Sequence, residues 1–308
     1  MHCKNLAIAL AMAGGALAQR PTSTPICDYY TTALLKTNSA ENQYTLLTLL
    51  VNTVVIGNYT QPNVGVKVPG ILATGTYNGA EVNLLPYFNG KLASSNRGGS
   101  SGVSVNFLDG GGADPLMKNM PANDNKSKQY FLLTHLYQFF GALLGCSQYG
   151  MTGFPSYGGQ ASMYQVHKFM DLDVNEVGYF IQQVALAGAS FGVSQDDLKA
   201  VGMALNQLFG MRCSPPATAI PAQGAQLQAI CIENNCPIAT NAACASYAPA
   251  VAPMTASAGM NSTATSTPTT TAKSTSTATA TPSTVPTAGA AIHGASWAAI
   301  VGFFALLL

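Results

Sequence analysis

Residues 162–209 have the sequence SMYQVHKFMDLDVNEVGYFIQQVALAGASFGVSQDDLKAVGMALNQLF, and this stretch decides the fold. Asp173 and Glu176 have the spacing of a capping box, which predicts a helix that runs to about Ser190. Ser194 and Asp197 repeat that device before a final helix. Apolar residues recur in both segments with the period of a helix that buries one face. The inward-facing residues are Val177, Phe180, Ile181 and Val184 in the first helix and Leu198, Val201, Leu205, Leu208 and Phe209 in the second.

Three more helices are predicted around this pair. Residues 128–144 (KQYFLLTHLYQFFGALL) place apolar side chains on one helical face and end at Gly145. Residues 162–169 favour a short helix. Residues 42–56 (NQYTLLTLLVNTVVI) are apolar almost all round, so a buried helix competes with a pair of strands, and their length favours the helix. The predicted fold class is therefore mainly α.

A long loop insertion is expected before the helix at 128–144. Residues 69–124 are rich in Gly, Asn and Ser, which predicts loops with short elements, one of them over residues 84–92. The motif DGGGAD at 109–114 could bind phosphate or calcium through backbone amides and its two carboxylates. Because no strand and helix frame the motif, a flexible loop is the favoured interpretation.

Both ends of the chain have the character of processed segments. Lys4 and the apolar run that follows it predict a signal peptide over residues 1–18, cleaved after Ala18. Residues 289–308 combine small residues, a short spacer and an uncharged apolar tail, which predicts a glycolipid (GPI) anchor attached at Gly289. A weak tail anchor, or an apolar end without function, is the alternative.

A stalk is predicted between the folded domain and the anchor. Of the 33 residues from 255 to 287, 19 are Ser or Thr, and such a composition cannot form a core. We therefore expect an O-glycosylated stalk over residues 248–288 and a folded domain over residues 27–247. The chain should then lie at the extracellular face of the plasma membrane or in a cell wall.

The cysteines agree with secretion. Cys3 leaves with the signal peptide, and an even number of cysteines remains in an oxidising compartment. Three disulfides are expected, with fifteen possible pairings. Residues 213–247 should form a disulfide-rich cap rather than a zinc site, because they contain no histidine and no CxxC pair. The mature cysteines are Cys27, Cys146, Cys213, Cys231, Cys236 and Cys244, and the predicted N-glycosylation sites are Asn58, Asn125 and Asn261.

Charge and residue type exclude several functions. Only 8% of the 308 residues are charged, with a net charge of +1, so nucleic acid is not an expected partner. A nucleophilic triad is not expected, because histidine is scarce and all mature cysteines should be paired. Asp171, Asp173 and Glu176 form a cluster that would suit a glycosidase, but helix capping explains Asp173 and Glu176 better.

Histidine chemistry in the folded domain depends on His135 and His167 alone. His167 lies among apolar residues, where a neutral imidazole needs hydrogen bonds for its nitrogens. One nitrogen can donate to a backbone carbonyl in the preceding turn. The other nitrogen would then face an apolar space, which is the arrangement that a haem iron needs from a proximal ligand. A histidine that is simply satisfied in the core is the alternative.

Residues 139–213 resemble the C-terminal part of the truncated haemoglobins, and the clearest match spans 129–213. The resemblance rests on the order and spacing of Leu144-Gly145, Tyr157-Gly158, Met163 with His167, Leu172-Asp173-Val174, Phe180, and Gly192-Val193. It implies a globin-like helical domain that binds haem b, with His167 as the proximal ligand of the iron. It also implies that the haem is lined by Met163, Val166, Leu172, Phe180 and Ile181.

The resemblance fades upstream of residue 139. If Phe139 and Phe140 align with an aromatic pair of the family's distal helix, Leu132 and Leu136 lie over the iron. His135 would then meet a haem propionate at the edge. A small shift of the helix would instead bring His135 to the sixth coordination position. The distal tyrosine typical of the family is not placed, although Tyr44 and Tyr59 are available.

The sequence thus predicts a cell-surface haem protein that binds or senses a diatomic gas, or handles haem. A peroxidase has less support, because it needs an arginine beside a distal base and the folded domain offers only Arg97 and Arg212. The alternative is a cofactor-free structural or adhesive protein of the cell wall. A surface hydrolase is a third hypothesis.

Overall fold

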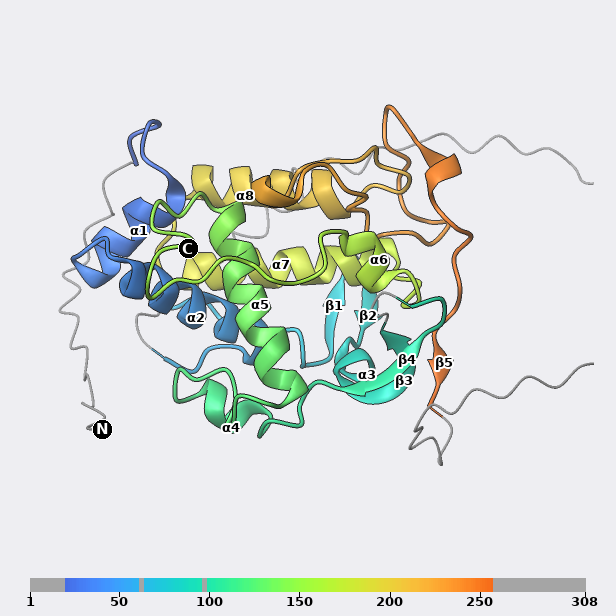
Figure 1. Cartoon of the computed structure of the whole chain (residues 1–308), viewed down its shortest axis with the longest axis horizontal. Helices are drawn as coiled ribbons and strands as arrows, with labels where there is room; N and C mark the ends of the chain where they lie inside the picture. Colours follow the sequence, from blue (N-terminus) through green and yellow to red (C-terminus); the bar gives the residue numbers. More distant parts are fainter. Residues whose placement is uncertain (1–19, 61–63, 96–98, 257–308) are drawn as a thin grey trace, which may run out of the picture. The chain divides into compact units, whose positions relative to one another are not determined.

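The structure, a computed structural model, describes residues 20–60, 64–95 and 99–256, all within one compact unit. The helical pair predicted from the decisive stretch is present: α7 spans Val174–Ser190 and α8 spans Gln195–Phe209. At the start of α7, the Asp173 carboxylate accepts a hydrogen bond from Glu176 N at 2.8 Å, and Asp173 N donates to Glu176 Oε2 at 3.0 Å. The predicted capping box is confirmed. The two helices pack against each other (Figure 1).

The predicted second capping box is only half formed. Ser194 Oγ accepts from Asp197 N at 3.3 Å, as expected, but Ser194 N donates to Tyr30 Oη at 2.8 Å. The Asp197 carboxylate does not return to Ser194 N, because it accepts from Arg20 at 2.6 Å and from Tyr30 Oη at 2.8 Å. Ser194 Oγ also lies 3.1 Å from this carboxylate. Long-range partners on the N-terminal segment thus replace the local bond.

Residues 42–56 form a helix, and the competing pair of strands is excluded. α1 spans Ile26–Leu35, α2 spans Ala40–Ile56 and α5 spans Lys128–Leu143. α2 is apolar almost all round because it packs against α1, α5 and α7 at once. Tyr137 of α5 is completely buried and donates to Asn52 Oδ1 of α2 at 2.6 Å.

The insertion after α2 contains more regular structure than its composition predicts. It forms a two-stranded antiparallel sheet that packs on α7 and an antiparallel hairpin that contacts α5 and α6. The element expected over residues 84–92 is split between a short helix and a strand. The elements are β1 (Gly75–Tyr77), β2 (Ala80–Val82), α3 (Leu85–Phe88), β3 (Asn89–Ser95), β4 (Val103–Asn106) and α4 (Ala113–Leu116).

The DGGGAD motif is fixed to the start of α5. The Asp109 carboxylate accepts from Lys128 N at 3.2 Å and from Gln129 N at 3.0 Å. Gly112 N donates to Gln129 Oε1 at 2.8 Å, and Gln129 is completely buried. The loop therefore supplies partners for free N–H groups at a helix N-terminus, and the interpretation as a flexible loop was wrong in that respect.

The cysteines pair as Cys27–Cys146, Cys213–Cys244 and Cys231–Cys236, which confirms the prediction of three disulfides. The short helix α6 (Met163–His167) is also present as predicted. After α8 the chain is largely irregular, with two 3₁₀ turns, η1 (Pro221–Gln223) and η2 (Cys244–Ser246). It continues into the expected stalk, where β5 (Met254–Thr255) pairs with β3 (Figure 1).

The described chain is thus mainly helical, with small antiparallel sheets. None of its described helices is long and apolar enough to cross a membrane. The predicted signal peptide, the anchor segment with Gly289, most of the stalk and Asn261 lie outside the described residues.

Two helical glycines should respond in opposite ways to alanine. A Cβ atom added at Gly202 of α8 meets open space, so Gly202→Ala should stabilise the protein by about 1 kcal/mol through helix propensity. A Cβ atom added at Gly141 of α5 overlaps the ring of Phe154, so Gly141→Ala should cost ~1–3 kcal/mol. Thermal unfolding of both variants tests this, and a lower melting temperature for Gly202→Ala would contradict it.

The Asp197 network should contribute strongly to stability. Burial alone would raise the pKa of Asp197, but hydrogen bonds from Arg20, Tyr30 and Ser194 outweigh burial and leave the pKa lowered. Asp197→Asn should therefore reduce the free energy of unfolding at neutral pH by ~3 kcal/mol, because Arg20 loses its charged partner. Urea unfolding measures this loss.

The pH dependence has a defined sign. A lowered pKa gives stabilisation that is present above the unfolded value of 3.8 and lost as the pH falls through the folded value. The difference between Asp197→Asn and the parent should therefore shrink below about pH 4. Asp196→Asn, at the exposed neighbouring position, is the matched control, and an equal loss in both variants would show that the network contributes nothing.

Candidate functional site

His167 lies in the last turn of α6, a helix of five residues. The Ser162 side chain caps this helix by accepting from Gln165 N at 3.2 Å. His167 Nδ1 lies 2.7 Å from Met163 O, so the ring bonds to the carbonyl one turn back, as predicted. This contact directs Nδ1–H at the backbone and leaves Nε2 as the nitrogen that can bind a ligand.

The protonation state of His167 suits metal coordination. Burial lowers the pKa of the ring, and the hydrogen bond to Met163 offsets only part of that effect. The imidazole is therefore neutral at pH 7. A neutral ring with its Nδ1 proton engaged presents a lone pair at Nε2. The residue as a whole is intermediate in exposure.

The apolar residues predicted around a haem belong to one hydrophobic cluster. Met163, Leu172 and Ile181 are buried in its core. The others pack against the core but remain partly exposed, as side chains that line an open recess would: Val166 of α6, Phe180 of α7, and Leu132 and Leu136 of α5. The predicted set thus comes from α5, α6, α7 and the segment between α6 and α7.

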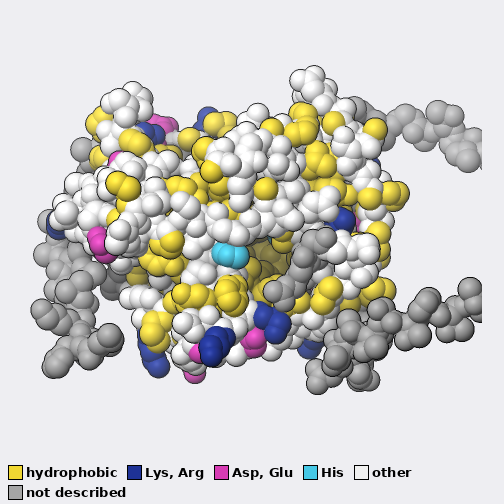
Figure 2. All heavy atoms as spheres, in the orientation of Figure 1, with side chains coloured by type: hydrophobic (Ala, Val, Ile, Leu, Met, Phe, Trp, Pro, Cys, Tyr) yellow, Lys and Arg dark blue, Asp and Glu magenta, His cyan; other side chains and the backbone are white. Residues whose placement is uncertain are grey.

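Figure 2 shows a hollow on the face of the molecule that α5 crosses. Hydrophobic side chains form its floor, and a histidine lies at its edge. Lys or Arg side chains lie below the hollow in the same view, with Asp or Glu side chains among them. An apolar hollow with a histidine at its edge offers a ligand an apolar surface and one polar side chain.

His135 lies on α5 and is also half-buried. Its ring contacts the ring of Tyr157 edge-on, with centroids 5.5 Å apart, and Tyr157 also contacts Phe139 at 5.6 Å. Burial lowers the pKa of His135, so this ring is neutral at pH 7 as well. The sequence did not predict this contact, because Tyr157 belongs to a loop whose path no periodic pattern indicates.

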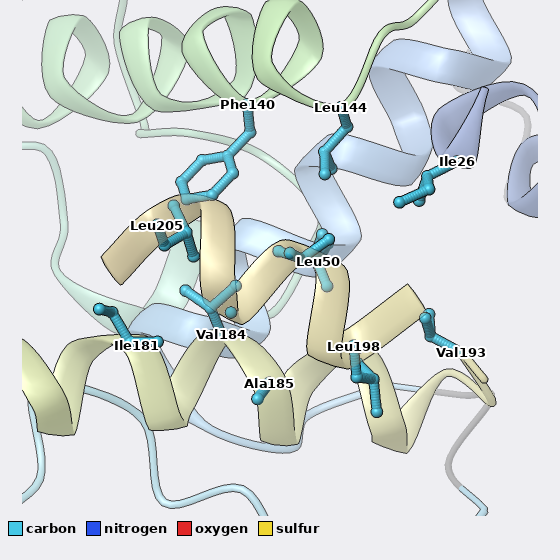
Figure 3. A pocket seen from close by; sticks show the side chains of 13 residues that line it. Ile26, Leu50, Phe140, Leu144, Ile181, Val184, Ala185, Val193, Leu198 and Leu205 are labelled. Carbon is cyan, nitrogen blue, oxygen red and sulfur yellow. The ribbon is translucent and has the colours of Figure 1, made fainter. Parts of the chain in front are cut away.

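A second space, separate from the hollow, lies deeper in the helical core. This cavity of about 50 Å³ lies between α1, α2, α5, α7 and α8, and neither histidine lines it. Figure 3 shows that every labelled side chain around it is a hydrocarbon. Such a cavity has room for a small apolar molecule but offers no group to orient a polar substrate. Its lining residues include Leu50, Phe140, Ile181, Val184, Leu198 and Leu205.

Two of the three acidic residues that follow α6 have a structural role. Asp173 and Glu176 cap α7, and Glu176 Oε1 accepts from Tyr87 Oη at 3.0 Å. Burial raises the pKa of Glu176, and burial followed by the charge of Glu233 raises that of Asp171. Among the described residues, no three or more His, Cys, Asp or Glu side chains form a group that could hold a metal ion. A haem iron differs, because the porphyrin supplies most of its ligands.

One short sequence motif would be consistent with a hydrolase. Residues 188–192 (GASFG) fit the GxSxG spacing of a nucleophile elbow, which requires a serine on a turn from a strand to a helix. Here Ser190 ends a helix, is buried, and donates from Oγ to Ala187 O at 2.8 Å. The geometry of a nucleophile elbow is therefore not formed at Ser190.

The predicted N-glycosylation sites within the described residues lie at the surface. Asn58 and Asn125 are both exposed. The Oδ1 atom of Asn58 accepts from Val68 N at 2.6 Å.

Comparison with known proteins gives no relative from which a function could be transferred. No family model matches the chain, and neither the curated proteins nor the solved structures contain a significant match.

Proposed function

We propose that the chain is a cell-surface haem-binding protein with a globin-like domain and that Nε2 of His167 is the axial ligand of the iron. The observation that carries this proposal is the 2.7 Å contact between His167 Nδ1 and Met163 O on a short helix next to partly exposed apolar side chains. That contact fixes the tautomer and aims the free nitrogen, as second-shell hydrogen bonds do at metal sites.

The apolar residues of three helices would hold the faces of haem b. Val166 and Phe180 would contact it on the side of His167, and Leu132 and Leu136 would contact it from α5. Buried Met163, Leu172 and Ile181 would support these contacts from the core. The group would supply an iron atom that binds a diatomic gas or exchanges an electron.

His135 has two roles that the proposal keeps open. It would bind a propionate at the haem edge or approach the sixth coordination position of the iron. Its contact with Tyr157 supports the edge position, because the aromatic ring occupies one side of the imidazole. Burial raises the pKa of Tyr157 to about 12, and its hydroxyl donates to Gln160 O at 3.0 Å. The phenol thus stays protonated and holds this loop in place.

Among the uses considered, we place binding or sensing of a diatomic gas first. The hydrocarbon-lined cavity between α1, α2, α5, α7 and α8 would accept such a molecule, because its lining side chains offer no polar group. A peroxidase role has weaker support. Arg212 donates to Asn234 Oδ1 at 3.0 Å within the cap, and Arg97 lies outside the described residues.

The alternative function is that of a cofactor-free structural or adhesive surface protein. It is favoured by the three disulfides, which staple the domain without any ligand. The two functions differ in a simple observable, which is uptake of haem by the purified protein.

The domain should bind haem b and show a Soret band at about 400 nm. His167→Ala should abolish or greatly weaken binding while the fold survives, because the variant loses one coordinate bond and gains only a small cavity. Haem titration followed by absorption, with and without reductant and carbon monoxide, measures both effects. Because the pKa of His167 is lowered, binding should not weaken between pH 8 and pH 7.

His135→Ala is the matched control, since it removes the other described histidine. It should leave the affinity largely unchanged if His135 meets a propionate, and it should change the ferric spectrum if His135 is an iron ligand. Equal haem affinity and identical spectra for His167→Ala and the parent would refute the site and favour the cofactor-free alternative.

We also propose that the domain is held at the cell surface by the predicted stalk and lipid anchor. A stalk of roughly forty residues at ~3.1 Å each would lift the domain on the order of 100 Å from the bilayer. A phosphatidylinositol-specific phospholipase should release the protein from membranes of its native host. Detection of the peptide Trp297–Leu308 in the mature protein would contradict this prediction.

A further inference from the structure

The cystine-rich cap holds the helix that carries His167 at both of its ends. At the start of α6, Leu227 O accepts from Ser162 Oγ at 2.6 Å and from Tyr164 N at 3.3 Å. After α6, Leu172 O accepts from Ile232 N at 3.1 Å. A helix of five residues cannot maintain its own position, because its few internal hydrogen bonds do not offset the cost of forming the first turn. The cap, together with the contacts of α6 with β3, therefore holds α6 in place.

Gln228 is the side chain that connects the cap most directly to His167. It is 1% exposed, and its amide makes contacts in two directions. Its Oε1 accepts from Met163 N at 3.2 Å, while its Nε2 donates to Ala161 O at 3.0 Å and lies 3.4 Å from Ala217 O. Met163 N is a first-turn donor that has no partner within the helix, so Gln228 satisfies a group that burial would otherwise penalise.

Two hydrogen bonds link the cap to the His167 ring, and both involve the backbone of Met163. Its N–H is held by Gln228 Oε1, and its carbonyl oxygen accepts from His167 Nδ1 at 2.7 Å. The position of the Met163 backbone thus sets the direction of the imidazole ring.

The segment that contains Gln228 is also bound to the end of α8. Ile230 N and Cys231 N both donate to Phe209 O at the end of α8, at 3.0 and 2.8 Å. Cys231 is completely buried and forms a disulfide with Cys236. The segment that contains Gln228 is therefore anchored to α8 immediately after it reaches α6. Movement of α6 relative to α8 would break these bonds.

We infer that Gln228 is a positioning residue for His167: through Met163 it fixes the direction in which Nε2 points, and thereby the geometry of the iron–histidine bond. The consequence for haem rests on the proposed function. The effect on the ring itself does not, because the contacts between Gln228, Met163 and His167 involve only protein groups.

The first experiment uses the full domain without haem. In Gln228→Leu, the Met163 amide should exchange its hydrogen about tenfold faster than in the parent, because it loses its only described acceptor. The ring nitrogen signals of His167 in NMR spectra should shift, because Nδ1–H is no longer held in one direction. Gln226→Leu is the matched control: Gln226 lies in the same segment, and its side chain donates to Gln223 O rather than to α6.

The conservative variant separates positioning from general packing. Gln228→Glu keeps an acceptor oxygen for Met163 N, and because a carboxyl buried at this position stays protonated, its O–H can replace one of the two donor contacts of Nε2. It should retain the slow exchange of Met163 and the parent's His167 signals, which also keeps the test valid if Gln228→Leu does not fold. A folded Gln228→Leu with unchanged exchange and ring signals would overturn the inference, as would equal losses in Gln228→Glu and Gln228→Leu.

The second experiment uses the haem-loaded protein. The iron–histidine stretching band of the ferrous form should shift or broaden in Gln228→Leu and remain at the parent's position in Gln226→Leu and Gln228→Glu. An unchanged band in Gln228→Leu would overturn the consequence for the iron. A parent that takes up no haem would refute the proposed function, whereas the NMR measurements on haem-free protein would still decide the role of Gln228.

Discussion

Buried amide side chains join the irregular segments of this chain to its helices, and the rest of the structure depends on them. The backbone of a loop that packs against a helix must have its buried N–H and C=O groups hydrogen-bonded. A chain with only 8% charged residues has few ions for this purpose. An amide can donate and accept at once and carries no charge, so its burial costs less than that of an ion. The amides that are 0–1% exposed and bonded in this way are Gln43, Asn52, Gln129, Gln183 and Gln228.

These amides connect separate segments of the chain, which lie 8 residues apart for Gln129 and Pro121 and 113 residues apart for Gln183 and Gly70. Gln183 of α7 accepts from Gly70 N at 3.0 Å and so fixes the start of the insertion. Gln129 donates to Gly112 O and Pro121 O, both at 2.9 Å, and thereby holds the loop before α5. Gln228 does the same for α6. These bonds explain how a chain with long irregular stretches maintains one arrangement of its helices.

The sequence predicts the helices well but not these amides, for a physical reason. Capping boxes and apolar periodicity are local signals, so they predicted α5, α6, α7 and α8. A buried glutamine looks like any polar residue in the sequence, because its partner can lie more than a hundred residues away, as Gly70 does from Gln183. The same reason explains Asp197, whose local cap was predicted but whose partner Arg20 is separated from it by 177 positions.

The candidate site shows the same division between local and long-range information. The bond from His167 to Met163 O spans one helical turn, and helical spacing was enough to predict it. The contact of His135 with Tyr157 and the contact of Gln228 with Met163 could not be predicted, since each depends on the path of an irregular segment. These irregular segments contact α6, so they would orient His167 in the proposed site. The cap, stapled by two disulfides, and the insertion, through β3, both contact the region of α6. The disulfide-rich cap and the insertion are therefore parts of the chain that hold the proposed ligand helix in place.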